Sequence, residues 1–461
     1  MFKDTRQRRA VSRAAAAIAG MLAIAGCNLF NTDVKNPTAV EESALDNPAA
    51  GATLANGLAS AVVRAHASVL GAMGTVTDEL TWVGSREYYN LLDGGDITDP
   101  FNEYFNDNGW PNVAQARWLS EYTIRRLEKF NTDGVIRNRT DLARSYVYAA
   151  TIYNMIGEMY DDFVISSDRQ EGGAPIGPNN MRVMFDSAAA FLTRAQAVPG
   201  ISDDLRRQIL GLRARTRHSA AIWATLRPAR TAPANPLIND AQANADAVAA
   251  LAVMTPDYRY RINTTPQNRP GINIGFEMNQ RLEIRAGSEI INPDGTNLRP
   301  LAGLAGIKLV DPVTGQPDAT VARAIDECCR AASGQDIPFT ITSAAQMYLI
   351  LAEAALAAGN TAEFTTRINQ ARAINGKPAW TSASTVTARN LLIHERRVHL
   401  FLNGQRLSDL YRFGLKADRW LPNVIAFKKA CFAPIPFLER QTNPKAIEQG
   451  GTTSSRPSYC Q

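Results

Sequence analysis

Residues 343–376 carry the pattern of two helices joined by a very short turn, and this pattern constrains the fold most. Ser343 and Asn360 each stand at a helix start, and each is followed three positions later by Gln or Glu, as in a capping box. Gly359 and Gly376 end the two helices. Helices separated by one or two residues must lie antiparallel. The alanine-rich faces and a unit of about 34 residues predict packing like that of a tetratricopeptide repeat.

Helical periodicity of apolar residues extends over most of the chain. Apolar positions recur at the three- and four-residue spacing that gives a helix one buried face. Together with the hairpin above, they predict a mainly α fold built from tetratricopeptide-like helical hairpins. The expected helices cover 41–71, 112–130, 139–160, 184–198, 203–226, 238–253, 343–358, 361–374 and 386–401.

Three long pieces lack this periodicity, at 74–111, 161–183 and 255–341. They are rich in Gly, Pro, Asn and Asp, which favour turns and loops. Two runs at 272–276 and 282–284 have the apolar alternation of short strands. We therefore expect an irregular, loop-rich lobe with short strands beside the helical hairpins.

The N-terminus has the features of an exported lipoprotein. Residues 1–26 hold five Lys/Arg and one Asp, and their apolar stretch is too short to span a bilayer. The run Ile-Ala-Gly-Cys that ends at Cys27 resembles the lipobox of bacterial lipoproteins. The resemblance implies a mature chain that begins at a lipid-modified Cys27, and Asn28 resembles the outer-membrane sorting pattern. The alternative is an ordinary secretory signal followed by a chance cysteine.

Charge does not support binding to nucleic acid. Without 1–26 the chain holds 44 basic and 43 acidic residues, so the high isoelectric point comes largely from the signal segment. We expect a signal peptide at 1–26, a tether at 27–48 and one body at 49–461. Within the body, the N-terminal part covers about 49–255 and the C-terminal part about 256–461.

Four cysteines remain after Cys27: Cys328, Cys329, Cys431 and Cys460. An even number in an exported protein favours disulfides. The neighbours Cys328 and Cys329 are expected to reach separate partners, tying their segment to Cys431 and to Cys460. A bridge between the two neighbours and a zinc site are the alternatives. The zinc site is disfavoured because the sequence has no C-x-x-C pair.

Three sequence blocks follow one another in the C-terminal part. They are 342–354 with Gly359, Asn360, Ile368, Asn369 and Arg372; Glu395-Arg396-Arg397 with 404–414; and Pro434-Ile435-Pro436 with Glu439 and Asn443-Pro444. These blocks resemble the SusD/RagB family and stand in that family's order. The resemblance implies a surface-exposed outer-membrane lipoprotein, mainly helical like the SusD superhelix, with no enzyme activity and no cofactor. Such a protein binds a nutrient oligomer, most often a glycan and in some cases a peptide, and forms a lid on a SusC-like TonB-dependent transporter.

Aromatic residues concentrate at 82–118. Sugar rings have apolar faces that pack on aromatic side chains, and their hydroxyls need polar partners. The ligand-binding candidates are therefore Trp82, Tyr88 and Tyr89 with the interleaved Arg86, Asn90 and Asp93. The alternative is that the aromatics anchor the loop to the helical body; Trp118, on an expected helix, is assigned to the core. The full set is Trp82, Tyr88, Tyr89, Phe101, Tyr104, Phe105, Trp110 and Trp118.

Charged residues of the C-terminal blocks form a second constellation. We expect a structural ion-pair network rather than an active site, because no nucleophile or metal cluster accompanies them; a partner contact is the alternative. His394 and His399 are five positions apart, whereas zinc-binding histidines on one helix face are four apart. Asp93, Asp96 and Asp99 lack the full calcium-loop pattern. The network residues are Glu395, Arg396, Arg397, Arg406, Asp409 and Arg412.

Two other functions remain open from the sequence. One is a surface lipoprotein enzyme such as a glycoside hydrolase, although no catalytic motif stands out. The other is a helical-repeat scaffold that binds protein partners.

Overall fold

Side-chain caps mark the starts of most long helices in the structure, which is a computed structural model. Asn138, Ser202, Asp240, Ser343 and Asn360 each accept a hydrogen bond from a backbone N–H of the first helical turn. The structure describes residues 42–98, 108–166, 172–227, 229–293, 299–330, 334–448 and 460. Cys27, the signal peptide and most of the tether lie outside these ranges, as do Phe101, Tyr104 and Phe105.

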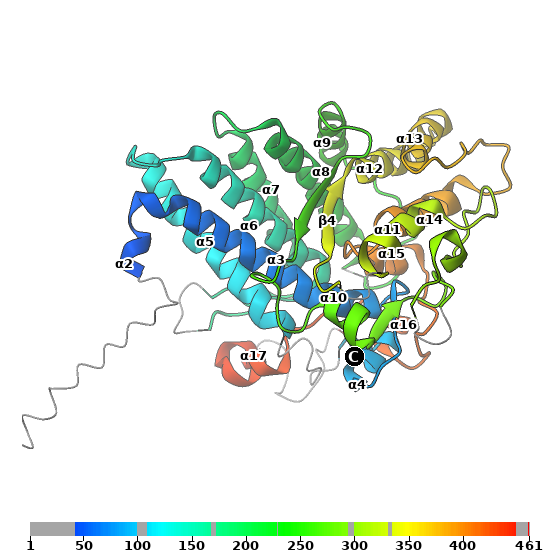
Figure 1. Cartoon of the computed structure of the whole chain (residues 1–461), viewed down its shortest axis with the longest axis horizontal. Coiled ribbons are helices and arrows are strands. Elements are labelled where there is room, and N and C mark those ends of the chain that lie inside the picture. The colour runs from blue at the N-terminus through cyan, green and yellow to red at the C-terminus, as the bar shows by residue number, and fades with distance from the viewer. Residues whose placement is uncertain are drawn as a thin grey trace, which may run out of the picture. The chain divides into compact units, whose positions relative to one another are not determined.

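The chain divides into two units, Met1–Asn47 and Pro48–Gln461. In the first unit the described part contains α2 (Glu42–Leu45). In the second unit the mainly helical fold is confirmed (Figure 1). Its principal helices are α3 (Gly51–Thr75), α4 (Glu87–Asp93), α5 (Trp110–Thr132), α6 (Arg139–Met159), α7 (Arg182–Gln196), α8 (Asp203–Leu226), α9 (Ala241–Leu251), α11 (Ala319–Cys328), α12 (Ala344–Ala357), α13 (Thr361–Ala373), α14 (Ala388–His399), α15 (Arg406–Phe413), α16 (Ile425–Lys428), α17 (Phe437–Thr442) and α18 (Pro444–Glu448).

Consecutive long helices pack side by side as hairpins. Helices α3, α5, α6, α7 and α8 follow one another across the body, and α8 continues the series to α9 and α12 (Figure 1). The predicted pair at 343–376 is α12 and α13, whose contact encloses Leu349, Phe364 and Trp380. Gly359 (φ 71°) and Gly376 (φ 67°) end the two helices in the left-handed conformation that glycine tolerates. Only half of the first capping box forms: the Gln346 N–H donates to Ser343 Oγ at 3.2 Å, but Gln346 Oε1 accepts no hydrogen bond in return.

The strands are short and form two antiparallel pairs in the described part. β1 (Leu80–Trp82) pairs with β3 (Ile284–Ala286), and β2 (Arg259–Asn263) pairs with β4 (Pro338–Ser343). The predicted strand at 282–284 overlaps β3 by one residue. The strand predicted at 272–276 is wrong, because Asn273 accepts a hydrogen bond from Phe276 N–H and starts the short helix α10 (Ile274–Phe276). Helices α4 and α11 lie in pieces that we expected to be non-helical.

The disulfide pairing differs from the expected one. Cys328 bonds to its neighbour Cys329, and Cys431 bonds to Cys460. Cys328 ends α11, and no partner from the C-terminal segment reaches it because Cys431 is held elsewhere, by Tyr411 Oη donating to its carbonyl at 2.8 Å. The bridge that joins residues distant in the sequence is therefore Cys431–Cys460, 29 positions apart.

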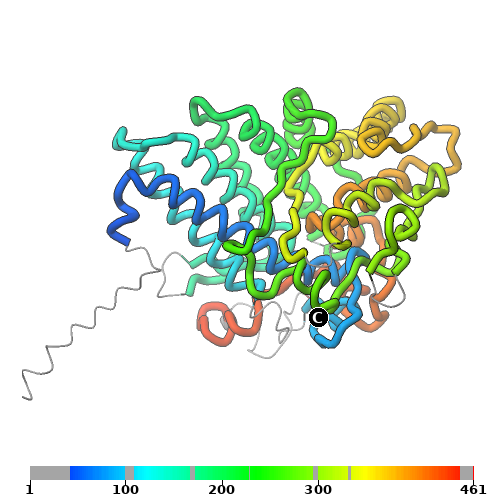
Figure 2. Tube along the Cα trace, in the orientation of Figure 1, coloured from blue at the N-terminus to red at the C-terminus, as the bar shows by residue number. Residues whose placement is uncertain are grey.

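Segments from opposite ends of the second unit lie side by side (Figure 2). The N–H of Leu421 donates to the carbonyl of Gly94 at 3.0 Å, and Trp420 Nε1 donates to the carbonyl of Val76 at 2.8 Å. The segment that contains β1 and α4 is thus packed directly against the C-terminal part. Among the described residues, no helix combines the length and apolar character that crossing a membrane requires.

Candidate ligand-binding site

The aromatic segment after α3 is held in place by a two-stranded ribbon. β1 pairs with β3 so that Trp82 lies opposite Ile284 and Thr81 lies opposite Arg285. Ile284 is fully buried, whereas Trp82 is half-buried. The ribbon therefore fixes the backbone below Trp82 and leaves part of its indole at the surface.

Glu283 ties the turn after β1 to the other strand. Its carboxylate accepts hydrogen bonds from the N–H groups of Ser85 (2.7 Å) and Arg86 (2.9 Å). Burial opposes ionisation of Glu283, but these N–H groups and the Ser85 hydroxyl outweigh it and hold its pKa below the usual value. A Cβ at Gly84 would stand 2.2 Å from Glu283 Oε2 and 2.5 Å from Glu283 Cα, so this close approach requires glycine.

Arg86 and Tyr88 form the polar part of the same surface. Arg86 Nη1 donates to the Tyr88 hydroxyl at 2.5 Å and lies 3.5 Å from Glu277 Oε1. Both Arg86 and Tyr88 are half-buried. Glu277 is fully buried, and burial raises its pKa to about 7 although Arg86 opposes the shift. The guanidinium is thus held by the Tyr88 hydroxyl and by Glu277. A half-buried phenol beside it, and the half-buried indole of Trp82 four positions earlier in the chain, suit a ligand with both an apolar face and hydroxyls.

Two of the predicted ligand residues face the interior. Tyr89 is fully buried, and Asp93 accepts hydrogen bonds from the Thr81 hydroxyl (2.8 Å) and from Trp82 N–H (3.0 Å). Asp93 therefore fixes the end of β1 and is not available to a ligand. Asn90 is half-buried and donates to Glu87 at 3.0 Å. The accessible candidates are Trp82, Arg86, Tyr88 and Asn90, which we call the Trp82 surface.

Residues of the second C-terminal block contact the segment that leads into β1. Arg406 donates two hydrogen bonds to Asp78, at 2.6 and 2.7 Å, and Arg397 lies 3.0 Å from the same carboxylate. Glu79 accepts from the N–H of Leu402 at 2.8 Å. Burial raises the pKa of Glu79 to about 8, so this carboxyl group is mostly protonated at neutral pH. Two predicted network residues, Arg397 and Arg406, therefore clamp the segment that enters β1.

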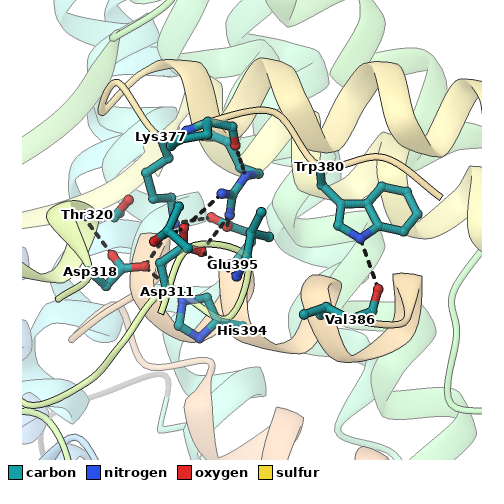
Figure 3. A network of polar contacts seen from close by, with 12 residues as sticks. Asp311, Asp318, Thr320, Lys377, Trp380, Val386, His394 and Glu395 are labelled. Carbon is teal, nitrogen blue, oxygen red and sulfur yellow. Dashed lines mark hydrogen bonds and ion pairs between the residues drawn. The ribbon is translucent and has the colours of Figure 1, made fainter. Parts of the chain in front are cut away.

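Glu395 belongs to a buried network that joins α14 to the loops before α11. Arg372 donates to Glu395 at 2.5 Å, and Lys377 donates to Glu395 at 2.7 Å. Lys377 also donates to Asp318 at 3.0 Å, and His394 Nε2 lies 2.8 Å from the same carboxylate. Figure 3 shows Lys377 and His394 converging on Asp318, with Glu395 beside them. Every member has an oppositely charged partner, as expected of a structural cluster.

The remaining network residues surround two further buried carboxylates. Asp409 accepts hydrogen bonds from Arg396 and Arg412, both at 2.9 Å. Glu353 accepts from Arg412 and lies 3.1 Å from His218 Nε2. Burial opposes ionisation of Glu353, but the Arg412 guanidinium, together with the contact to His218 and the nearby Arg396, holds its pKa well below the usual range. The network thus connects α8, α12, α14 and α15 inside the body rather than at its surface.

Within the described residues, Asp311, His394 and Glu395 come close enough together to share a metal ion. Arg372 occupies that position instead, because it donates to Asp311 at 2.8 Å as well as to Glu395. His399 lies 3.4 Å from Glu395 and His394 contacts Asp318, so the two histidines do not converge. The arrangement is that of an internal ion-pair cluster.

Comparison with known proteins agrees with these features. Residues 330–452 match the SusD family, and no curated protein sequence matches the chain significantly. A SusD superfamily protein from Parabacteroides distasonis shares the fold at a TM-score of 0.57 with 14% identity, covering 87% of this chain and 98% of its own. A SusD homolog from Bacteroides thetaiotaomicron shares the fold at a TM-score of 0.54 with 14% identity, covering 92% of this chain and 94% of its own. A SusD-like carbohydrate binding protein from Bacteroides vulgatus shares it at a TM-score of 0.52 with 12% identity, covering 80% of this chain and 84% of its own. The fold of the chain is that of SusD-like helical proteins, and residues 330–452 carry the match to the SusD family.

Proposed function

We propose that this protein is a non-catalytic, surface-exposed outer-membrane lipoprotein that binds a nutrient oligosaccharide and passes it to a SusC-like TonB-dependent transporter. The observation that carries the binding part is the Trp82 surface, where the indole of Trp82 ends β1, the guanidinium of Arg86 stands in the following turn and the phenol of Tyr88 lies in the first turn of α4. Stacking on the rings and hydrogen bonds from Arg86 match the two chemical faces of a sugar. The carbohydrate-binding protein of similar fold from Bacteroides vulgatus is consistent with this ligand class.

The main competing function is glycoside hydrolysis. Its candidate catalytic pair would be Glu277 and Glu283, the two glutamates that contact Arg86. A hydrolase needs one protonated and one ionised carboxyl group facing the ligand. The pKa of Glu277 is raised and that of Glu283 is lowered, which is the required order. However, Glu277 is fully buried and Glu283 is 3% exposed with its oxygens bonded to the turn. We therefore favour binding.

Native gels cast with a series of soluble polysaccharides, combined with a reducing-end assay, separate these functions. Binding predicts that at least one polysaccharide retards the protein and that no new reducing ends form. Hydrolysis predicts reducing ends that disappear in both Glu277→Gln and Glu283→Gln, and that result would overturn the proposal. Retardation by none of the polysaccharides would also count against it.

The membrane anchor is tested through Cys27. In a host that processes lipoproteins, the wild-type protein should incorporate labelled fatty acid and enter the detergent phase. Cys27→Ser should lose both properties. A Cys27→Ser protein that still carries the acyl label would contradict the lipoprotein proposal. Capture of a TonB-dependent barrel with the lipidated protein, from detergent-solubilised outer membranes, tests the transporter partner.

A further inference from the structure

A hollow lies at the N-terminal half of α5, and none of its lining residues belongs to the Trp82 surface. It has a volume of about 370 Å³ and lies between α5, the residues that follow Phe163 and the start of α17. Its size is near the lower end of the range for small-molecule sites. Its lining residues are Trp110, Ala114, Gln115, Arg117, Trp118, Val164, Ser166 and Glu439.

The α5 side of the hollow is aromatic and rigid. Trp118 was expected in the core, but it is half-buried because its position on α5 faces the hollow rather than a neighbouring helix. Its ring packs against Tyr122 at 4.8 Å between centroids, and the Arg126 guanidinium lies 3.7 Å over the Tyr122 ring. This row of planar groups along one helix face fixes the orientation of Trp118 and offers an apolar surface.

Polar groups stand around this surface in fixed positions. Glu439 accepts a hydrogen bond from Trp110 Nε1 at 3.0 Å and another from Asn443 at 2.9 Å. A carboxylate has about four acceptor sites, so Glu439 can accept further hydrogen bonds. Arg117 is 1% exposed, donates to the Ser166 carbonyl and lies 3.0 Å from Glu121. The buried guanidinium therefore locks the wall of the hollow to α5.

The donors and acceptors of the hollow distinguish between ligand classes. The Gln115 side chain is exposed and can both donate and accept, as can the Ser166 hydroxyl. The hydroxyls of a sugar can donate to Glu439 and accept from Gln115. A carboxylate or phosphate would instead meet the like charge of Glu439. The combination of an indole, an acceptor and an amide favours a neutral ring with several hydroxyls.

We infer that the hollow between Trp118 and Glu439 is a second carbohydrate site that takes one or two neutral sugar rings. It is separate from the Trp82 surface and does not share residues with it. The inference rests on the proposed function only in that both sites take carbohydrate. Two separated contacts on one ligand would raise the affinity for long oligosaccharides above that for short ones.

Fluorine NMR of the protein labelled with 5-fluorotryptophan reads both sites separately. The chain has six tryptophans, and single Trp→Phe variants assign their signals. The probes are mono-, di- and hexasaccharides of glucose, galactose, mannose and xylose. We expect at least one disaccharide to shift the Trp118 signal saturably while the signal of Trp380, 3% exposed in the core, stays in place. A shift at Trp82 without one at Trp118 overturns the second site and leaves the proposed function standing. A shift at Trp118 alone supports the second site and overturns the Trp82 surface as the binding site of the proposed function, and no shift at either signal counts against both.

Gln115→Ala tests the polar part of the hollow without disturbing the fold, because this side chain is exposed. Loss of one hydrogen bond should raise the Kd read at Trp118 by about two- to tenfold and leave the Kd read at Trp82 unchanged. Gln242→Ala, the same substitution at an exposed position on α9, is the matched control and should change neither value. An unchanged Kd at Trp118 in Gln115→Ala would contradict the assigned role of Gln115 in this site.

Discussion

Trp82 and Tyr89 belong to the same aromatic segment, yet only Trp82 keeps part of its ring at the surface. The difference follows from position. Trp82 ends β1 opposite the fully buried Ile284 and is itself half-buried, whereas Tyr89 lies on the inner face of α4 with buried Leu92. At the residue scale, accessibility therefore divides the candidate ligand groups from the anchoring groups.

Trp82→Ala should separate ligand binding from stability. If the indole stacks on a sugar, its loss should raise the Kd by roughly three- to tenfold, since aromatic contacts contribute about 0.5–1.5 kcal/mol beyond area burial. The melting temperature should stay close to that of the wild type. Tyr89→Ala is the matched control and should lower the free energy of unfolding by roughly 3–5 kcal/mol, because its ring is fully buried. Calorimetric titration and scanning calorimetry give both values; a large melting-temperature drop in Trp82→Ala would assign Trp82 to the core.

Protonation of the buried Glu79 should make the free energy of unfolding depend on pH. Its pKa is raised by burial from 4.5 to about 8, so between pH 6.5 and 8 the folded protein holds a proton that the unfolded chain has released. Stability must therefore fall as the pH rises through this window, by roughly 1.4 kcal/mol per pH unit for one proton. Glu79→Gln, which keeps the acceptor for Leu402 N–H, should have a shallower slope in urea denaturation at pH 6.5 to 8. Glu87→Gln, at an exposed position, should keep the wild-type slope. Equal slopes in Glu79→Gln and the wild type would contradict a protonated Glu79.

At the scale of elements, the turn between β1 and α4 depends on contacts that no local sequence pattern reveals. Glu283 holds Ser85 and Arg86 from almost 200 residues away, and Arg406 holds Asp78 from an even greater distance. The turn is rigid because these partners satisfy its backbone and side-chain groups, not because its own residues favour one conformation.

Gly84→Ala tests this rigidity. The added Cβ would clash with the side chain and backbone of Glu283, so the ribbon must shift, and overpacking of this kind costs about 1–3 kcal/mol. Binding at the Trp82 surface should weaken with it. Gly57 lies on α3, and a Cβ added there would meet no neighbouring atom within 4 Å. Gly57→Ala should therefore stabilise the protein by about 0.5–1 kcal/mol. Urea denaturation of both variants measures the effects, and equal stability of Gly84→Ala and the wild type would contradict the tight approach.

At the scale of the whole second unit, the family block of the C-terminal part has a structural task. Its charged residues reach α8, α12 and the segment before β1, so buried ion-pair clusters hold both the helical hairpins and the irregular lobe. The long-range bridge Cys431–Cys460 adds a covalent link.

The two disulfides should contribute unequally to stability. Cys431 and Cys460 are 29 positions apart, and closing such a loop restricts the unfolded chain by about 2–4 kcal/mol. Cys328 and Cys329 are neighbours, so their bond closes no loop of this kind. Cys431→Ala/Cys460→Ala should therefore lower the melting temperature clearly, and Cys328→Ala/Cys329→Ala should lower it much less. The opposite order in scanning calorimetry would contradict this assignment.

The sequence predicted the helices well because their signals are local. Ser343, Asn360 and the glycines that follow act within one helical turn, and the structure has helices at those positions. Helix α11 was missed although Asp318 caps it and Val321, Ala322 and Ile325 give it a buried face, since the surrounding Gly and Pro concealed the pattern. Glu277 and Glu283 gave no local signal, because their partners come from the other half of the chain. For the same reason, the sequence could not show that Asp93 and Tyr89 are buried or that Trp118 lines a hollow.

A crystal structure of the mature protein with a bound oligosaccharide tests the central claim most directly. The ligand should be the tightest binder among the polysaccharide fragments. The account predicts a sugar ring packed on Trp82, with Arg86 donating to its hydroxyls and Tyr88 at its edge. Ligand density that leaves Trp82, Arg86 and Tyr88 untouched, at saturating oligosaccharide, would contradict it.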